Sequence, residues 1–211
     1  SAELSAIANV NAQLGLQILL AAAGIAIPTL CHHPLLRPEG ACRVCVCKVT
    51  NARSFLPACI AKATEGMEVF TNTPKVLEGR KTTLELILSD HKKDCLNCVR
   101  NNNCELQTLA LEMGCDAHRF NGVTNDYAID ATTPYLVRDN NKCVLCRRCV
   151  AVCKHTQTVS AIGANARGFD THIGCSFEKT LDKVNPDLIV LTGDNISGYD
   201  VLEEKDAEKA I

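Results

Sequence analysis

Tryptophan is absent from this 211-residue chain, and only three tyrosines and five phenylalanines occur. Any hydrophobic core must therefore be built mainly from leucine, isoleucine, valine and alanine. Hydrophobic residues still make up 46% of the sequence, which is enough for one large domain or for two to three small ones. The expectation is a packed globular protein whose cores contain few aromatic rings.

An excess of positive charge is also missing, because 22 Lys and Arg residues stand against 24 Asp and Glu residues. Proteins that bind nucleic acid usually carry a basic patch, so we expect no nucleic-acid partner. The sequence also lacks the glycine-rich phosphate-binding motifs and the G-x-S-x-G and H-E-x-x-H motifs of hydrolases. We therefore predict no catalytic residues.

Signals for export or membrane insertion are weak. The longest apolar stretch, residues 14–27, is interrupted by Gln17 and Gly24, and the first basic residue is Arg37. A secretory signal peptide would begin with a positively charged region, and a membrane-spanning helix would need about 20 apolar residues. We expect a soluble, cytoplasmic protein that does not span a membrane.

Cysteine, by contrast, is abundant: fourteen residues fall in three groups, at 31–59, 95–115 and 143–175. So many cysteines serve either as disulfides in an oxidising compartment or as metal ligands, and the cytoplasmic expectation favours ligands. The grouping predicts three modules, with boundaries at residues 1–75, 76–135 and 136–211.

Hydrophobic periodicity indicates short elements around these groups. Residues 14–24, 74–90 and 104–114 read as helices, and the second should bury Leu77, Leu84, Ile87 and Leu88 on one face. Residues 42–50 alternate in the way expected of a strand. The helix over 74–90 would deliver His91 just beyond its end.

The third group has the most specific spacing. Its cysteines follow the pattern C-x2-C-x2-C-x3-C, which is the signature of bacterial-type iron-sulfur clusters, at Cys143, Cys146, Cys149 and Cys153. A loop around a 4Fe-4S cube can present a thiolate at every third residue, whereas a zinc ion usually draws two separated pairs. The pattern predicts a 4Fe-4S cluster.

The first group has a C-x2-C pair and a distant fourth cysteine, as in plant-type 2Fe-2S sites, although its first gap is longer. The predicted ligands are Cys31, Cys42, Cys45 and Cys59. We interpret Cys47 as a small buried hydrophobic residue, which is the common state of a free cysteine.

The second group, "HKKDCLNCVRNNNC", is ambiguous by itself, since zinc, disulfides or an iron-sulfur cluster would each fit three cysteines and a histidine. Between two iron-sulfur motifs it predicts a second 4Fe-4S cluster, held by His91, Cys95, Cys98 and Cys104. A neutral imidazole in place of a thiolate should raise the cluster's reduction potential. The rival interpretation is a zinc-stabilised, non-redox interaction scaffold.

Three stretches together resemble a known family. They are "IPTLCHHPLLRPEGACRVCVCKV" with "LPACIAKATEGMEVFTNT", "SDHKKDCLNCVRNNNCELQTLA", and "DNNKCVLCRRCVAVC" through "RGFDTHIG". The resemblance, over about residues 25–178, is to the N-terminal iron-sulfur region of the large peripheral subunit of NADH dehydrogenase (complex I). Multi-cluster iron-iron hydrogenases, the small diaphorase subunit of NAD-reducing hydrogenases and some NAD-dependent formate dehydrogenases share this region.

The resemblance implies an α+β chain with three domains: a plant-type ferredoxin (β-grasp) domain, a small helical domain with one histidine and three cysteine ligands, and a bacterial ferredoxin-like domain. It implies one 2Fe-2S and two 4Fe-4S clusters that relay single electrons between a flavin- and NAD(P)H-binding subunit and a second redox site. The implied partners also include a small thioredoxin-like 2Fe-2S subunit and a hydrogenase or other terminal redox subunit.

The chain departs from the family in three places. Residues 1–12 lack the alternation expected of an opening hairpin, and Asn102 replaces a usual glycine. The second cysteine run expected at about residues 186–200 is replaced by "PDLIVLTGDNISGYD". That run would supply the fourth ligand of the third cluster, so either Cys153 or Cys175 replaces it or the site is incomplete. We assign this ligand to Cys153 by position and hold Cys175 in reserve.

Overall fold

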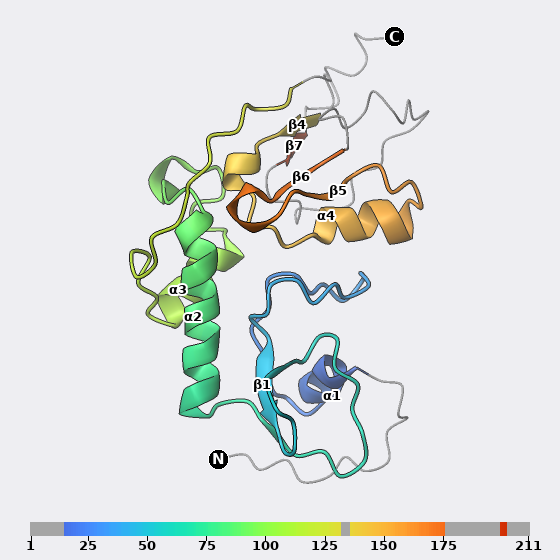
Figure 1. The fold of residues 1–211 in the computed structure, drawn as a ribbon. Coiled ribbons are helices and arrows are strands. Elements are labelled where there is room, and N and C mark those ends of the chain that lie inside the picture. Colours follow the sequence, from blue (N-terminus) through green and yellow to red (C-terminus); the bar gives the residue numbers. More distant parts are fainter. Residues whose placement is uncertain (1–14, 132–135, 176–198, 202–211) are drawn as a thin grey trace.

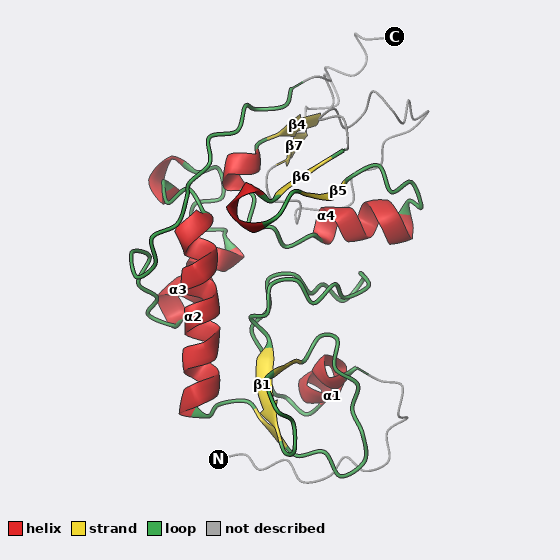
Figure 2. Cartoon of the chain, viewed as in Figure 1, coloured by secondary structure: helices red, strands yellow, loops and turns green. Residues whose placement is uncertain are grey.

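The computed structural model describes residues 15–131, 136–175 and 199–201. Helices and short strands alternate with long loops, so the expected mixed helix-and-sheet character is confirmed (Figure 2). The expectation about residues 1–12 lies outside the described residues. No helix in the described part of the chain is long and apolar enough to cross a bilayer.

The first cysteine group lies in a unit built from one helix and a small sheet (Figure 1). Helix α1 (Leu16–Ala22) ends just before Gly24, whose φ of +76° is the left-handed conformation that commonly stops a helix. The antiparallel sheet has the order β2-β1-β3, with β1 (Val46–Val49) between β2 (Leu56–Pro57) and β3 (Val69–Phe70). Leu16 and Leu20 of α1 share a core with Val49 of the sheet.

The central strand begins later than predicted. We expected extended backbone from Cys42, but β1 starts at Val46. Arg43 has a φ of +59°, which cannot be accommodated in a regular strand. Residues 42–45 therefore form a loop that carries two cysteines into the unit.

Helix α2 (Pro74–Asp90) has the predicted bounds. The side chain of Thr73 accepts a hydrogen bond from the amide of Val76, and proline occupies the first turn, where its missing N–H costs nothing. His91 follows the last residue of the helix. The helix thus delivers His91 to the second cysteine group, as the sequence predicted.

The buried face of α2 differs from the predicted one. Leu77 is 44% exposed, and the packing stripe consists of side chains four residues apart: Val76, Arg80, Leu84 and Leu88. Arg80 is buried because its guanidinium donates two hydrogen bonds, of 3.0 and 2.8 Å, to the carbonyl oxygen of Val46. A pattern of apolar residues alone could not include this arginine, which fixes α2 against β1.

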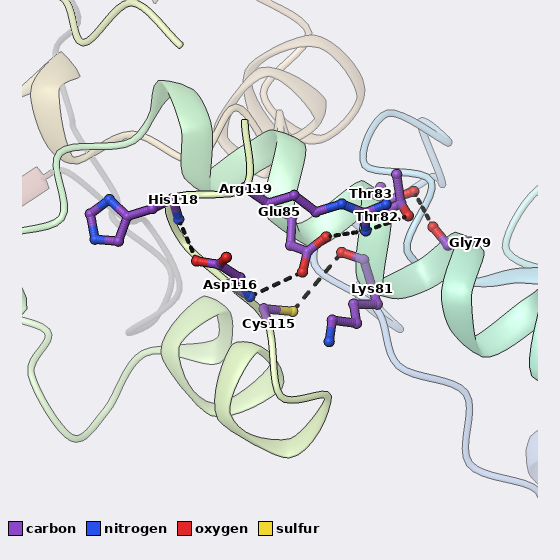
Figure 3. Close-up of polar contacts among 9 residues, drawn as sticks. All are labelled: Gly79, Lys81, Thr82, Thr83, Glu85, Cys115, Asp116, His118 and Arg119. Carbon is purple, nitrogen blue, oxygen red and sulfur yellow. Dashed lines mark hydrogen bonds and ion pairs between the residues drawn. The ribbon is translucent and has the colours of Figure 1, made fainter. Parts of the chain in front are cut away.

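Helix α3 (Glu105–Glu112) packs against α2 and ends before Gly114, which has a φ of +58°. The chain then returns along α2, held by the buried carboxylate of Glu85 (Figure 3). Glu85 accepts a hydrogen bond of 3.0 Å from the amide of Asp116 and forms an ion pair of 2.7 Å with Arg119. This network ties residues 115–119 to the helix.

The third cysteine group lies among short elements beyond α2 (Figure 1). Strand β4 (Leu136–Arg138) pairs antiparallel with β7 (Tyr199–Val201), and β5 (Gly163–Asn165) pairs antiparallel with β6 (His172–Gly174). Helix α4 (Arg148–Ala151) continues directly into a π-helical turn, Val152–Thr156. Single 3-10 turns occur at Cys95–Asn97, Asn140–Lys142 and Gly168–Asp170.

Candidate metal centres

The four cysteines of the first group come together and are all buried: Cys31, Cys42, Cys45 and Cys59. The Cys31 thiol contacts those of Cys42 and Cys59, and the Cys59 thiol also contacts that of Cys45. A backbone hydrogen bond of 3.0 Å from Ala58 to Cys45 joins the loop before β1 to the segment after β2. Four ligands from three separate segments thus form one connected set.

These contacts favour thiolates at two of the four cysteines. Hydrogen bonds from Cys42 and then Cys59 lower the pKa of Cys31 to about 2, and a hydrogen bond from Cys59 lowers the pKa of Cys45 to about 7. The contact with Cys31 correspondingly raises the pKa of both Cys42 and Cys59. Because the thiolate is the metal-binding form, the set suits a metal centre.

Cys47 lies outside this set of contacts. Its thiol donates a 3.3 Å hydrogen bond to the carbonyl oxygen of Leu56, and burial raises its pKa to about 11. It packs with Leu16 and Leu20 in the core of the first unit. A buried, protonated thiol is a structural residue, as its sequence context suggested.

The second group lines one cavity of about 450 Å³, which contains all four predicted ligands: His91, Cys95, Cys98 and Cys104. They come from three places, since His91 follows α2, Cys104 precedes α3, and the other two bound a 3-10 turn. The cavity lining also includes three basic residues, Lys92, Arg100 and Lys142, and three acidic residues, Asp94, Asp126 and Asp139.

His91 is suited to act as a ligand. Its Nδ1 atom is buried and has no hydrogen-bond partner among the described residues. Burial also lowers the pKa of His91, so the imidazole is neutral near physiological pH. A neutral ring nitrogen is the form that coordinates metals, and a buried ring nitrogen without a partner is otherwise costly.

The third group occupies a tightly curved loop that leads into α4. Leu145 and Arg147 both have positive φ angles, of 54° and 60°, and the Leu145 amide donates a 3.4 Å hydrogen bond to the sulfur of Cys143. Burial raises the pKa of Cys143 to about 12, and the thiols of Cys146 and Cys149 are near enough to add to this effect. Amide groups directed at sulfur would stabilise these cysteines as thiolates.

The two candidates for a fourth ligand are both buried. Cys153 lies in the π-helical turn, where its sulfur accepts a hydrogen bond of 3.2 Å from the amide of Ala161. Cys175 follows β6. The assignment of the fourth ligand to Cys153 stays a prediction.

Each cysteine group contains residues other than glycine whose backbone is in the left-handed conformation. Within two residues of a proposed ligand, this conformation occurs at Arg43, Asn102, Leu145 and Arg147. Such conformations are uncommon and tend to persist where the surrounding structure enforces them, often at functional sites. Only Asn102 could be anticipated from the sequence, because asparagine tolerates this conformation.

The alternatives to clusters find no support. No disulfide joins any of the fourteen cysteines, all of which fall within the described residues. Within residues 15–131, 136–175 and 199–201, no three His, Cys, Asp or Glu side chains form a site for a single metal ion.

Sequence reasoning did not predict the contacts of Arg148. Its side chain is buried and forms an ion pair of 2.8 Å with Glu105. A pair of oppositely charged residues 43 positions apart gives no local sequence signal. Only the folded chain brings them together.

Comparison with known families gives two matches that do not overlap. Residues 9–74 match the 2Fe-2S iron-sulfur cluster binding domain. Residues 80–119 match the NADH-ubiquinone oxidoreductase-G iron-sulfur binding region. The matches cover the first and second cysteine groups.

Individual proteins extend the similarity to most of the chain. The NADP-reducing hydrogenase subunit HndD of Solidesulfovibrio fructosivorans is 39% identical over 162 residues, which are 74% of this chain and 28% of that protein. The NADH-ubiquinone oxidoreductase 75 kDa subunit of Reclinomonas americana is 32% identical over 176 residues, or 82% of this chain and 26% of that protein. The chain thus spans only about a quarter of the length of these curated relatives.

A solved structure shows the same arrangement. A chain in the crystal structure of NAD+-reducing [NiFe]-hydrogenase in the H2-reduced state has a TM-score of 0.77 and 26% identity, covering 89% of this chain and 80% of that chain. The two family matches support 2Fe-2S and 4Fe-4S binding, and the solved structure supports the overall arrangement of the chain. The chain therefore belongs to the family of iron-sulfur electron-transfer regions that NADH-ubiquinone oxidoreductase-G shares with subunits of hydrogenases.

Proposed function

We propose that this chain relays single electrons through three iron-sulfur clusters, between a flavin- and NAD(P)H-binding subunit and a second redox site of a hydrogenase or NADH dehydrogenase complex. When bound, such clusters supply one-electron carriers whose potentials depend on charge, hydrogen bonds and exposure. The polypeptide supplies the ligands, their spacing and their surroundings. The chain itself needs no acid, base or nucleophile for this function.

The first centre would be a 2Fe-2S cluster in a plant-type ferredoxin domain over residues 1–75. The thiol contacts support this assignment, since they join Cys31 to Cys42 at one end of the set and Cys59 to Cys45 at the other. Four cysteines and two irons allow two thiolates for each iron, and these adjacent pairs are the simplest division.

The second centre would be a 4Fe-4S cluster in a helical domain over residues 76–135, with His91, Cys95, Cys98 and Cys104 as ligands. Its support is the shared cavity and the buried Nδ1 atom of His91. The third centre would be a 4Fe-4S cluster in a ferredoxin-like domain over residues 136–211. Its proposed ligands are Cys143, Cys146, Cys149 and Cys153.

The observation that carries the proposal is a single apolar core that includes cysteines of all three groups. Cys31 and Cys42 are members of this core, and Cys104 and Cys146 pack against it. Leu30, Leu84 and Leu106 are buried members of the same core. Sites that exchange electrons must lie close together, and this shared core brings the three ligand sets into one structural unit.

The relatives named above are subunits of multi-subunit redox enzymes, and we extend this role to the present chain. Its partners would be the flavin- and NAD(P)H-binding subunit, a small thioredoxin-like 2Fe-2S subunit, and a hydrogenase or other terminal redox subunit.

Anaerobic purification of the full chain tests the proposal. We expect brown protein with about ten irons and matching sulfide, from one 2Fe-2S and two 4Fe-4S clusters. Dithionite reduction should bleach the visible absorption and produce paramagnetic signals. Colourless protein that contains zinc in place of iron would instead establish the scaffold interpretation and overturn the electron-relay function.

A further inference from the structure

One arginine of the third group connects all three cysteine groups. Arg148 is only 8% exposed, and its Nη2 atom donates a hydrogen bond of 3.0 Å to the carbonyl oxygen of His32, 116 residues earlier. Its Nη1 and Nη2 atoms donate to the two carboxylate oxygens of Glu105 at 2.9 and 2.8 Å. A single guanidinium therefore bridges segments that are far apart in sequence.

Each of the three residues joined by these hydrogen bonds is next in sequence to a proposed ligand of a different centre. His32 follows Cys31, Glu105 follows Cys104, and Arg148 itself precedes Cys149. Because neighbouring residues share a peptide bond, fixing His32, Glu105 and Arg148 also fixes the backbone of three ligands. Loss of the guanidinium would remove the hydrogen bonds that fix these three segments relative to one another.

The charge of Arg148 also lies beside ligands. Together with Cys104 and Cys146, the side chain lines a cavity of about 20 Å³ between the second and third groups. Glu105 is 45% exposed at its side chain, so solvent partly screens its negative charge. A fixed cation beside thiolate-bound iron stabilises the more negative, reduced state.

We propose that Arg148 is a positioning residue whose guanidinium fork fixes the separations of the three centres and whose charge raises the reduction potential of the third. This inference rests on the proposed function, because it assumes that the three groups hold clusters. The fork is essential, since it engages a carbonyl and both oxygens of a carboxylate at once. A lysine would keep the charge but lacks the planar, bidentate geometry.

The test compares the full, anaerobically purified chain with Arg148→Lys and Arg148→Met. Arg119→Met is the matched control, since Arg119 also forms an ion pair with a glutamate but belongs to the separate network around Glu85. Three quantities are measured: iron and sulfide content, the reduction potential of each centre, and the magnetic coupling between reduced centres in electron paramagnetic resonance. This coupling depends on the distance between the centres.

We expect Arg148→Met to weaken the coupling by about twofold or more, because a loosened site shifts by an ångström or so. The potential of its third centre should become more negative. Arg148→Lys should restore the potential but not the coupling, and Arg119→Met should change neither. If Arg148→Met does not retain its iron, the comparison of Arg148→Lys with the unmodified chain decides the question.

Unchanged coupling in Arg148→Lys would overturn the positioning role, and an unchanged potential in iron-replete Arg148→Met would overturn the electrostatic role. Absence of iron from the unmodified chain would overturn the proposed function instead. The two failures are therefore distinguishable.

Discussion

At the scale of single residues, chemically identical side chains have different roles because their surroundings differ. Cys45 and Cys47 are two positions apart and both buried. Contact with Cys59 lowers the pKa of Cys45, whereas burial raises that of Cys47. The first is a candidate ligand, and the second is part of a hydrophobic core.

Replacement of each by alanine should separate these roles. Cys45→Ala should remove the 2Fe-2S signal and about two irons from the purified chain. Cys47→Ala should keep all the iron and lower the free energy of unfolding by roughly 1 kcal/mol, the cost of a small lost contact. Iron analysis and anaerobic urea titration measure both quantities. Loss of the 2Fe-2S signal from Cys47→Ala would show that this residue is a ligand.

His91 allows a prediction about potential. Replacing His91 by cysteine substitutes a thiolate for a neutral imidazole, so the net charge of the second centre becomes more negative by one. We expect this cluster to be retained and its reduction potential to fall, as followed by redox titration with electron paramagnetic resonance. The other two potentials serve as internal controls. An unaltered potential would mean that His91 does not bind the cluster.

At the scale of elements, side chains from α2 anchor the segments that pack against this helix. Arg80 fixes the helix to β1, and Glu85 fixes the return segment after α3. For Glu85, burial alone would raise the pKa, but bonds from the Asp116 amide and Arg119 outweigh it, and the pKa is lowered. The ionised carboxylate therefore stabilises the fold.

Glu85→Gln should lower the free energy of unfolding by roughly 1–3 kcal/mol at neutral pH, because a charge-assisted hydrogen bond to a buried group is lost. Arg119→Met should lower the free energy of unfolding by less, since the Arg119 side chain is 42% exposed. A lowered carboxyl pKa contributes stability above its unfolded value and loses it as pH falls through the folded value. The difference between Glu85→Gln and the unmodified chain should therefore shrink in acid, as measured by denaturant titration. A difference in unfolding free energy that increased in acid would contradict a stabilising, ionised Glu85.

At the scale of the whole molecule, the clusters would act as structural elements. The core shared by the three groups includes Cys31 and Cys42 next to Leu30 and Val44. Metal binding contributes to folding whenever the ligands are brought together only in the folded state. The stability of this core should therefore depend on iron.

Removal of iron with a chelator under reducing conditions should increase hydrogen exchange around Leu30, Val44 and Leu106. The core of the first unit, around Leu16 and Val49, should also exchange faster, because it contains the proposed ligands Cys45 and Cys59. Mass spectrometry of exchange in chelated and untreated samples measures both regions. Equal protection in the two samples would show that the chain folds without its clusters.

Local sequence signals predicted the helices well. The bounds of α2 follow from Thr73, Pro74 and the residues before His91, and Gly114 ends α3 as expected. The buried face of α2 was less predictable: Leu77, which was expected to be buried, is exposed, and Arg80 is buried. The predicted start of β1 was wrong, because nothing in the sequence signals that the backbone of Arg43 adopts a left-handed conformation.

The sequence by itself determined the grouping and spacing of the cysteines, because ligand spacing within a loop is a local property of the chain. It also determined that His91 would stand at the end of α2. Only the tertiary structure decided that Cys31, Cys104 and Cys146 meet at one core, and that Arg148 joins His32 to Glu105. The hydrogen bonds of Arg148 span 43 and 116 residues, and the packing of the whole chain, rather than any local pattern, selects them.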